Sequence, residues 1–316
     1  MSSPERFQIL SLDGGGLKGI FTASFLAEWE KNRGTRVVDS FDLIAGTSTG
    51  GIIALALGLG FPAEEIVAFY RTEAANIFPT KRFSRVRQLF RPKYDRDGLR
   101  RVLEKYFGDR RLGESTKRLI IPSYSPEFRT VYLYKTAHHS RLQNDYKKSA
   151  VIVALSTAAA PTFLPAAVTS EGLGLIDGGI WANNPVMVAV TDALGYLDRP
   201  LSIVAALRIG TTNPVPSVEY YPTNAGFLKS VRPLLDFMIS AQVQSARDMA
   251  EHILGKQRYY EVNPNVAPGD FQLDRLSEKL IPLGSLMYRQ HSSNIEDLGF
   301  FDHKADPFVP VYELED

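Results

Sequence analysis

The stretch FDLIAGTSTGG, residues 41–51, is followed by a second apolar run, IIALALGLG, and the two runs meet at a turn of glycine, threonine and serine. The first run has the length of a buried β-strand, and the second has that of a buried helix. A serine at such a strand-to-helix turn can occupy a sharp bend that exposes its hydroxyl group. A serine that merely caps the turn fits the same pattern. Ser48 is therefore a candidate nucleophile that needs support from the rest of the chain.

Two more glycine turns follow apolar strand patterns. DGGGLKG, residues 13–19, leads into a helical pattern, so its backbone N–H groups can converge near a helix N-terminus, where negative charge is stabilised. An oxyanion formed during ester cleavage needs donors of this kind, and Lys18 adds positive charge nearby. In LIDGGIWANNP, residues 175–185, Asp177 closes a strand and two glycines follow. An aspartate that only caps a turn is also common at such a position.

A serine nucleophile needs a base, and the chain contains five histidines and no cysteine. The best histidines are those of KTAHHS, residues 135–140, but this stretch also fits a polar loop. Asp177 is the better candidate, because burial beside a serine, without a cationic partner, would raise its pKa into a useful range. The sequence predicts a Ser48–Asp177 dyad, in which Asp177 accepts the serine proton and later activates water.

Residues 14–19 also match Gly-x-Gly-x-x-Gly, the form of a dinucleotide-binding fingerprint. Asp39 lies at about the distance at which that fingerprint has its acidic residue. However, the acid belongs at the end of the second strand, and Asp39 precedes the second strand pattern. A dinucleotide site also gives no reason for GTSTG. A nucleotide-binding module is therefore the less favoured alternative.

Composition excludes several classes of protein. The formal net charge of the 316 residues is +1, so we expect no binding of DNA or RNA by bulk electrostatics. Without cysteine there is no disulfide, thiolate nucleophile or cysteine-ligated metal. The N-terminus lacks the long apolar stretch of a secretory signal, and the longest apolar run, residues 51–63, is too short to span a bilayer. We expect a cytoplasmic protein that needs no metal or organic cofactor.

Strand and helix patterns alternate up to about residue 212, which predicts an α/β fold with a mainly parallel central sheet flanked by helices. We expect a catalytic domain over residues 1–212 and a helical C-terminal extension, residues 213–316, packed on the same domain. One long helix is expected over residues 226–254. Its apolar stripe favours the core over a partner surface. The stripe comprises Leu228, Val231, Leu235, Met238, Ile239 and Val243.

Residues 81–101 contain nine lysines and arginines against two aspartates, with aromatic residues between them. A solvated connector fits this composition. So does a surface for anionic lipid headgroups, and so does a pocket for an anionic activator such as a cyclic dinucleotide. The sequence does not decide among these three interpretations.

DGGGLKG, GTSTG and DGG, in this order, resemble the patatin-like phospholipase family. The resemblance covers roughly residues 7–212 and implies a patatin-like α/β fold that hydrolyses acyl esters of membrane phospholipids. By motif position it implies that the nucleophile is Ser48, the base is Asp177, and the oxyanion donors are the N–H groups of Gly14, Gly15 and Gly16. A non-lipid esterase that uses the same dyad is the main alternative.

A narrower set of segments is similar to bacterial patatin-like effectors of cyclic-oligonucleotide antiphage systems. These segments are FDLIAGTSTGGIIALALGLG, KTAHH, VALSTAAAPTFL and LIDGGIWANNPV. The similarity implies activation by a cyclic dinucleotide and attack on the inner face of the cell's own membrane, and it leaves an oligomer open. The sequence departs at Arg208 in ALRIGTT, where a small polar residue is expected. No nucleotide-binding motif can be assigned to particular residues.

Overall fold

A mixed sheet runs through the computed structural model, which describes residues 6–79, 92–215 and 227–314, with the backbone alone for residues 227–235. Within these residues the sheet has eight strands in the order β5-β6-β3-β2-β1-β7-β9, and β4 pairs with β3. β8 and β10 form a separate pair. The strands are β1 (Phe7–Leu12), β2 (Leu43–Gly46), β3 (Arg118–Ser125), β4 (Thr130–Lys135), β5 (Ala167–Val168), β6 (Gly174–Asp177), β7 (Val204–Ile209), β8 (Asn213–Pro214), β9 (Tyr259–Val262) and β10 (Asn265–Val266).

The centre of the sheet is parallel, as the alternating pattern predicts. β3, β2, β1, β7 and β9 run in one direction, whereas β4 and β6 are antiparallel to β3. In a parallel pair the turns that follow the strands lie at the same edge. Leu12 pairs with Gly46, so the two glycine turns that follow β1 and β2 are neighbours.

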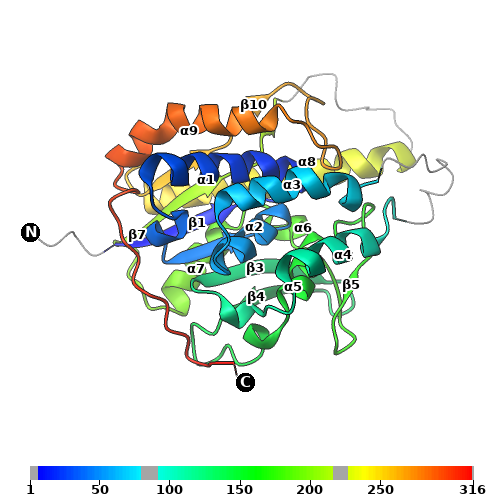
Figure 1. Ribbon diagram of the computed structural model, residues 1–316, viewed down its shortest axis with the longest axis horizontal. Helices are drawn as coiled ribbons and strands as arrows, with labels where there is room; N and C mark the ends of the chain where they lie inside the picture. The colour runs from blue at the N-terminus through cyan, green and yellow to red at the C-terminus, as the bar shows by residue number, and fades with distance from the viewer. Residues whose placement is uncertain (1–5, 80–91, 216–226, 315–316) are drawn as a thin grey trace, which may run out of the picture.

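Helices cover both faces of the sheet (Figure 1). α1, α2 and α5 pack on one face, and α9 and α3 lie along α1; α7 and the C-terminal part of α8 pack on the other face. Successive strand residues point to alternate faces of the sheet. Leu10 and Ile44 pack against the helices on the first face, and Ile9 and Leu43 pack against those on the second face. The helices are α1 (Gly19–Arg33), α2 (Thr49–Gly58), α3 (Ala63–Ile77), α4 (Arg96–Phe107), α5 (Ala150–Ala158), α6 (Gly179–Ala182), α7 (Val186–Gly195), α8 (Phe227–Leu254) and α9 (Leu280–Asp297).

The basic stretch 81–101 is only partly described, since residues 80–91 lie outside the described residues. Its last part is not a solvated connector: α4 begins at Arg96, and Leu99 and Val102 of that helix are buried. Asp95 caps the helix by accepting a hydrogen bond from the Asp97 N–H group. The connector interpretation is therefore wrong for the part of the stretch that forms α4.

The predicted core-facing stripe of α8 is wrong at Met238, whose side chain is 54% exposed. The helix packs instead through its C-terminal half, where Ala246, Ala250 and Leu254 are buried against α7 and the sheet. Small residues at this spacing let the helix approach the sheet closely. The side chains of Leu228, Val231 and Leu235 lie outside the described set.

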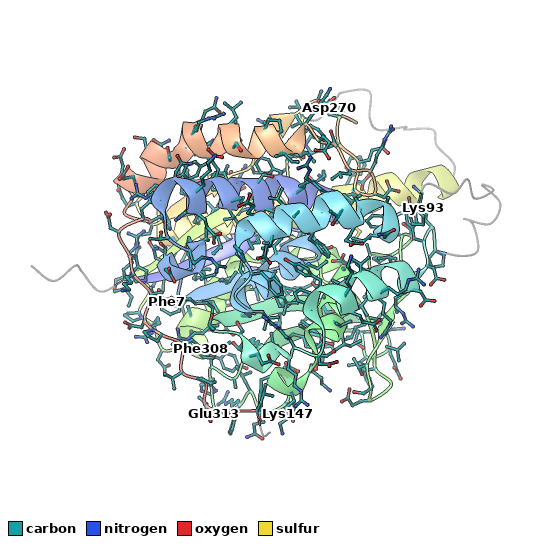
Figure 2. The ribbon with its side chains drawn as sticks, in the orientation of Figure 1. Phe7, Lys93, Lys147, Asp270, Phe308 and Glu313 are labelled. Carbon is teal, nitrogen blue, oxygen red and sulfur yellow. The ribbon has the colours of Figure 1, made fainter. Side chains whose placement is uncertain are left out.

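Residues after α9 run back over the molecule to the side chains around Lys147 (Figure 2). Two backbone hydrogen bonds fix this path: the Ala305 N–H group donates to Asp39 O, and the Val311 N–H group donates to Ala137 O. Together with β9, which extends the sheet beside β7, this part of the chain packs on the same core as the earlier elements. Among the helices of the described residues, none combines the length and hydropathy that crossing a bilayer requires.

Candidate active site

Ser48 occupies a strained turn between β2 and α2. Its backbone has φ 55° and ψ −121°, an unusual conformation for a residue with a side chain. The turn is tight enough that a Cβ atom at Gly46 would overlap the carbonyl oxygen of Gly50. Strain of this kind persists only where the surroundings hold it, and it is typical of a nucleophile elbow.

The Oγ atom of Ser48 donates a 2.7 Å hydrogen bond to Oδ2 of Asp177. The register of the sheet explains why the side chains of Ser48 and Asp177 lie side by side. Ala45 pairs with Ile120, and Ser48 and Ser123 each lie three residues further along. Asp177 pairs with Ser123 from the antiparallel strand β6, so the two side chains reach the same level from opposite directions.

Asp177 is 5% exposed, and its other oxygen, Oδ1, accepts a 2.7 Å hydrogen bond from the Gly179 N–H group. Burial raises the pKa of Asp177 to about 6, against the opposing effect of the hydrogen bonds from Ser48 and Gly179. A carboxylate in this range is a stronger base than one in water and remains ionised at neutral pH.

None of the five histidines has a hydrogen bond to Ser48 or Asp177 among the bonds of the described residues. His138 instead contacts Asp192 (Nε2–Oδ2, 2.9 Å), and His303 contacts Asp42 (Nε2–Oδ2, 2.7 Å). His291 contacts the Tyr260 hydroxyl, and His139 accepts from the Arg141 N–H group. The prediction that Asp177, not a histidine, stands beside the serine agrees with this geometry.

The glycine-rich turn after β1 lies directly against Ser48. A Cβ atom at Gly14 would lie 3.2 Å from the Cβ of Ser48. The Gly14 N–H group donates to Asn183 O (3.0 Å), and the Gly14 carbonyl accepts from Oγ1 of Thr211 (3.0 Å). In the described part of the chain, no hydrogen bond uses the N–H group of Gly15 or Gly16, so these two donors are open.

Several residues that the sequence did not single out hold these turns together. The Ser48 N–H group donates to Oγ1 of Thr157 (2.9 Å), and Thr157 donates to Pro122 O (2.6 Å). Thr47 donates to Ala182 O (2.6 Å) through its hydroxyl and to Leu12 O (3.1 Å) through its N–H group, so it joins all three glycine motifs. Threonine hydroxyls often bond to nearby backbone groups, in turns as at Thr47 and in helices as at Thr157, so the sequence carried no signal for these two.

Arg208 is 1% exposed and holds Asp13, the residue before the glycine turn. Its Nε atom lies 3.1 Å from both Asp13 oxygens, and its Nη2 atom lies 2.5 Å from Oδ2. Burial lowers the pKa of Arg208, but the Asp13 carboxylate outweighs this and raises it, so the guanidinium stays charged. The sequence did carry a signal for this ion pair: an arginine lies within the apolar strand VAALRI, and a charge buried there needs a partner of opposite charge.

Lys18 is the second cation near the turn and is 9% exposed. Burial lowers the pKa of Lys18 to about 8, against the opposing effect of Asp13 and Asp236.

The fold does not support the alternative of a dinucleotide-binding site at residues 14–19. Asp39 lies in a 3₁₀ turn (Val37–Ser40) at the amino end of β2, away from the glycine turn. The described residues contain no group of three or more histidine, aspartate or glutamate side chains placed to hold a metal ion.

Comparison with known protein families gives a match over residues 10–190 to the model described as patatin-like phospholipase. The chain belongs to the patatin-like phospholipase family. The match spans both members of the Ser48–Asp177 pair and the glycine turn, and it confirms the predicted patatin-like fold. The protein is accordingly a hydrolase of carboxylic esters.

Three bacterial patatin-like relatives carry the name cGAMP-activated phospholipase. The protein from Pseudomonas aeruginosa (strain BWHPSA011 / Pa011) is 32% identical over 88% of this chain and 85% of its own length. The protein from Escherichia coli (strain TW11681) is 31% identical over 96% and 95%. The Vibrio cholerae protein is 34% identical over 65% and 64%. The predicted likeness to cyclic-nucleotide-activated patatin-like enzymes is thus confirmed.

Proposed function

We propose that this patatin-like enzyme releases fatty acids from membrane phospholipids with Ser48 as nucleophile and Asp177 as base. The observation that carries the proposal is the 2.7 Å hydrogen bond from Ser48 Oγ to Asp177 Oδ2 on a strained elbow. A nucleophile already bonded to its base needs little reorganisation to react.

In the first half of the reaction, Ser48 Oγ attacks the acyl carbonyl carbon while Asp177 accepts the hydroxyl proton. The ester bond then breaks, the lysophospholipid alkoxide takes that proton, and the acyl group stays on Ser48. In the second half, Asp177 takes a proton from water, and the hydroxide attacks the acyl carbonyl. The fatty acid leaves, and the proton returns to Ser48. The pKa of about 6 suits Asp177 to both transfers.

The oxyanion formed in each half would be bound by the N–H groups of Gly15 and Gly16. Gly14, the third predicted donor, has its N–H group engaged by Asn183 O, so we assign it the role of holding the turn against Ser48. Two donors aimed at one oxygen supply a large share of the stabilisation in acyl transfer.

We further propose that a cyclic dinucleotide switches the enzyme on, as the names of three relatives state for those proteins. The reaction would then take place on the inner face of the membrane during antiphage defence. No residue of this chain is assigned to the activator.

The test is fatty acid release from vesicles of mixed phosphatidylcholine and phosphatidylglycerol, with and without cGAMP. Wild type, Ser48→Ala and Asp177→Asn would be compared, together with p-nitrophenyl butyrate as a soluble ester. We expect wild type to release fatty acid with cGAMP and both variants to be inactive. Cleavage of the soluble ester but never of vesicles would make the protein a non-lipid esterase. Equal rates for wild type and Ser48→Ala would overturn the dyad.

A further inference from the structure

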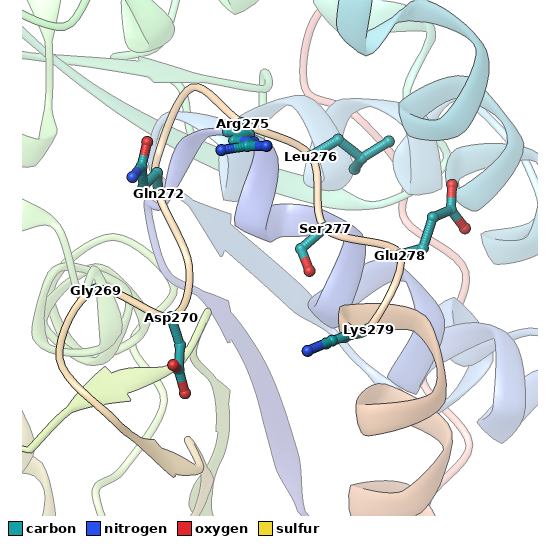
Figure 3. A pocket seen from close by; sticks show the side chains of 8 residues that line it. All are labelled: Gly269, Asp270, Gln272, Arg275, Leu276, Ser277, Glu278 and Lys279. Carbon is teal, nitrogen blue, oxygen red and sulfur yellow. The ribbon is translucent and has the colours of Figure 1, made fainter.

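A segment of the C-terminal part of the chain lies on the glycine-rich turn. The Leu17 N–H group donates a 2.7 Å hydrogen bond to Leu273 O. Gly16 has φ +58°, and a Cβ atom there would overlap the same carbonyl group. Figure 3 shows the segment, residues 269–279, passing across the turn that leads from β1 into α1. The contact is backbone to backbone, so its geometry depends on what holds Leu273 in place.

Asp274, the next residue, is the anchor of this segment. Its Oδ2 atom accepts a 2.8 Å hydrogen bond from the Tyr94 hydroxyl and is ion-paired with Lys93, and its side chain is 8% exposed. Burial raises the pKa of Asp274, but the hydrogen bonds from Lys93 and Tyr94 outweigh this and lower it. The carboxylate is therefore charged at neutral pH and bound on two sides.

Lys93 and Tyr94 are themselves held against the segment that follows α5. The Lys93 N–H group donates to Thr162 O (2.9 Å), and the Tyr94 N–H group donates to Phe163 O (2.8 Å). The Tyr94 ring packs edge-on against Phe78, with 4.9 Å between centroids. Residues 162–163 follow α5, the helix whose Thr157 accepts from the Ser48 N–H group. Asp274 thus joins the glycine turn to the same scaffold that supports Ser48.

We propose that Asp274 is a positioning residue for ester hydrolysis, which fixes Leu273 O so that the turn presents the Gly15 and Gly16 N–H groups to the oxyanion. The proposal rests on the oxyanion role given to these glycines above. Oxyanion donors act at ordinary hydrogen-bond distance, and their positions must stay within about 0.5 Å of the productive geometry to be effective. We call Leu273 and Asp274 the clamp; both lie outside residues 10–190, the part that matches the family model.

The first test is the Asp274→Asn variant, which keeps the size of the side chain and removes its charge. We expect kcat on phospholipid vesicles to fall about tenfold while KM stays within about twofold. The reason is that the variant displaces the glycine turn but leaves the residues that contact the substrate in place. Lys93→Met should cause a smaller loss of kcat, since the Tyr94 hydroxyl still donates to Asp274.

The matched control is Glu73→Gln. Glu73 is also a nearly buried carboxylate, 10% exposed in its side chain, and is paired with a lysine, Lys105. It lies between α3 and α4, and its hydrogen bonds within the described residues go to Lys105 and Asn76, not to the glycine turn. We expect it to leave kcat within about twofold of wild type. If Glu73→Gln and Asp274→Asn lowered kcat equally, the effect would be general destabilisation, and the proposal would be overturned.

Amide hydrogen exchange of a peptide covering residues 13–19 gives a measurement that does not depend on activity. We expect about tenfold faster exchange in Asp274→Asn and no change in Glu73→Gln, because only the former releases Leu17 from Leu273 O. Unchanged exchange would overturn the proposal even if wild type released no fatty acid and the proposed function had failed. Faster exchange with normal kcat would also overturn it, since the clamp would then hold the turn without serving the reaction.

Discussion

Asp13 and Asp177 stand in the same short motif, Asp-Gly-Gly, and both side chains are buried, at 3% and 5% exposure. Asp13 follows β1 and is bound by the Arg208 guanidinium, while Asp177 ends β6 and accepts from the Ser48 hydroxyl. Burial raises the pKa of Asp13 as well, but the Arg208 guanidinium opposes this effect and contacts both carboxylate oxygens, so the side chain holds the glycine turn. Asp177 has no ion pair within the described residues and accepts hydrogen bonds from Ser48 and Gly179, and burial raises its pKa to about 6. The partner, and not the motif, makes one aspartate structural and the other a base.

The largest difference between Asp13 and Asp177 should appear in the activity of their variants. Asp177→Asn should lower kcat at least about 1,000-fold, because the amide cannot accept the Ser48 proton. The measurement is fatty acid release under the conditions at which wild type is active. The control is the thermal unfolding of the same sample, which must show a folded protein. Activity within tenfold of wild type would contradict the role of Asp177 as base.

The same two positions should respond oppositely in stability. Asp13→Asn should lower the free energy of unfolding by about 3 kcal/mol, because it leaves the buried Arg208 guanidinium without its main partner. Thermal or urea unfolding checks this. The double variant Asp13→Asn/Arg208→Met removes both charges and should regain more than half of the loss. An Asp13→Asn protein as stable as wild type would mean that the ion pair contributes nothing.

Asp177→Asn should instead stabilise the protein at pH 7.5. A carboxylic acid whose folded-state pKa is raised contributes stability while it is protonated and loses it as pH rises through about 6. The shift from 3.8 to about 6 corresponds to about 3 kcal/mol that ionised Asp177 withdraws at neutral pH. The neutral amide avoids this cost, so the unfolding midpoint should rise. A lower midpoint at pH 7.5 would contradict the raised pKa.

The pH dependence of activity should follow the same group. Because only ionised Asp177 can act as base, kcat/KM should fall about tenfold per pH unit below about 6 and level off above it. Rates measured from pH 4.5 to 7.5, with each sample returned to pH 7 to confirm reversibility, test this. A profile with no bend near pH 6 would mean that another group, or another step, limits the reaction.

The smallest effect is expected at the outer partner of Arg208. Glu261 lies 2.5 Å from Nη1 of Arg208, but its side chain is 32% exposed, so water competes for the charge. Glu261→Gln should change the free energy of unfolding by less than about 1 kcal/mol, as judged by thermal unfolding. A loss as large as that of Asp13→Asn would show that both carboxylates are needed to hold the guanidinium.

Much of the fold could be predicted because it depends on short-range patterns. The apolar runs around Ser48 and before Asp13 predicted β1, β2 and α2. The long helix expected over residues 226–254 is α8, Phe227–Leu254. α4 was missed because a charged, amphipathic helix in a basic stretch looks like a connector.

The sequence by itself determined which side chains were available for the chemistry: one serine on an elbow between glycines, one aspartate at the end of a strand, and a triple-glycine turn. Only the tertiary structure decided how Asp177, the predicted base, reaches the serine: β6 runs antiparallel to β3 and brings Asp177 level with Ser48. It also decided that Arg208 binds Asp13 and that Leu273 and Asp274, more than 250 residues along the chain, hold the glycine turn. Contacts between distant segments depend on strand order and direction, and no local pattern of residues records these.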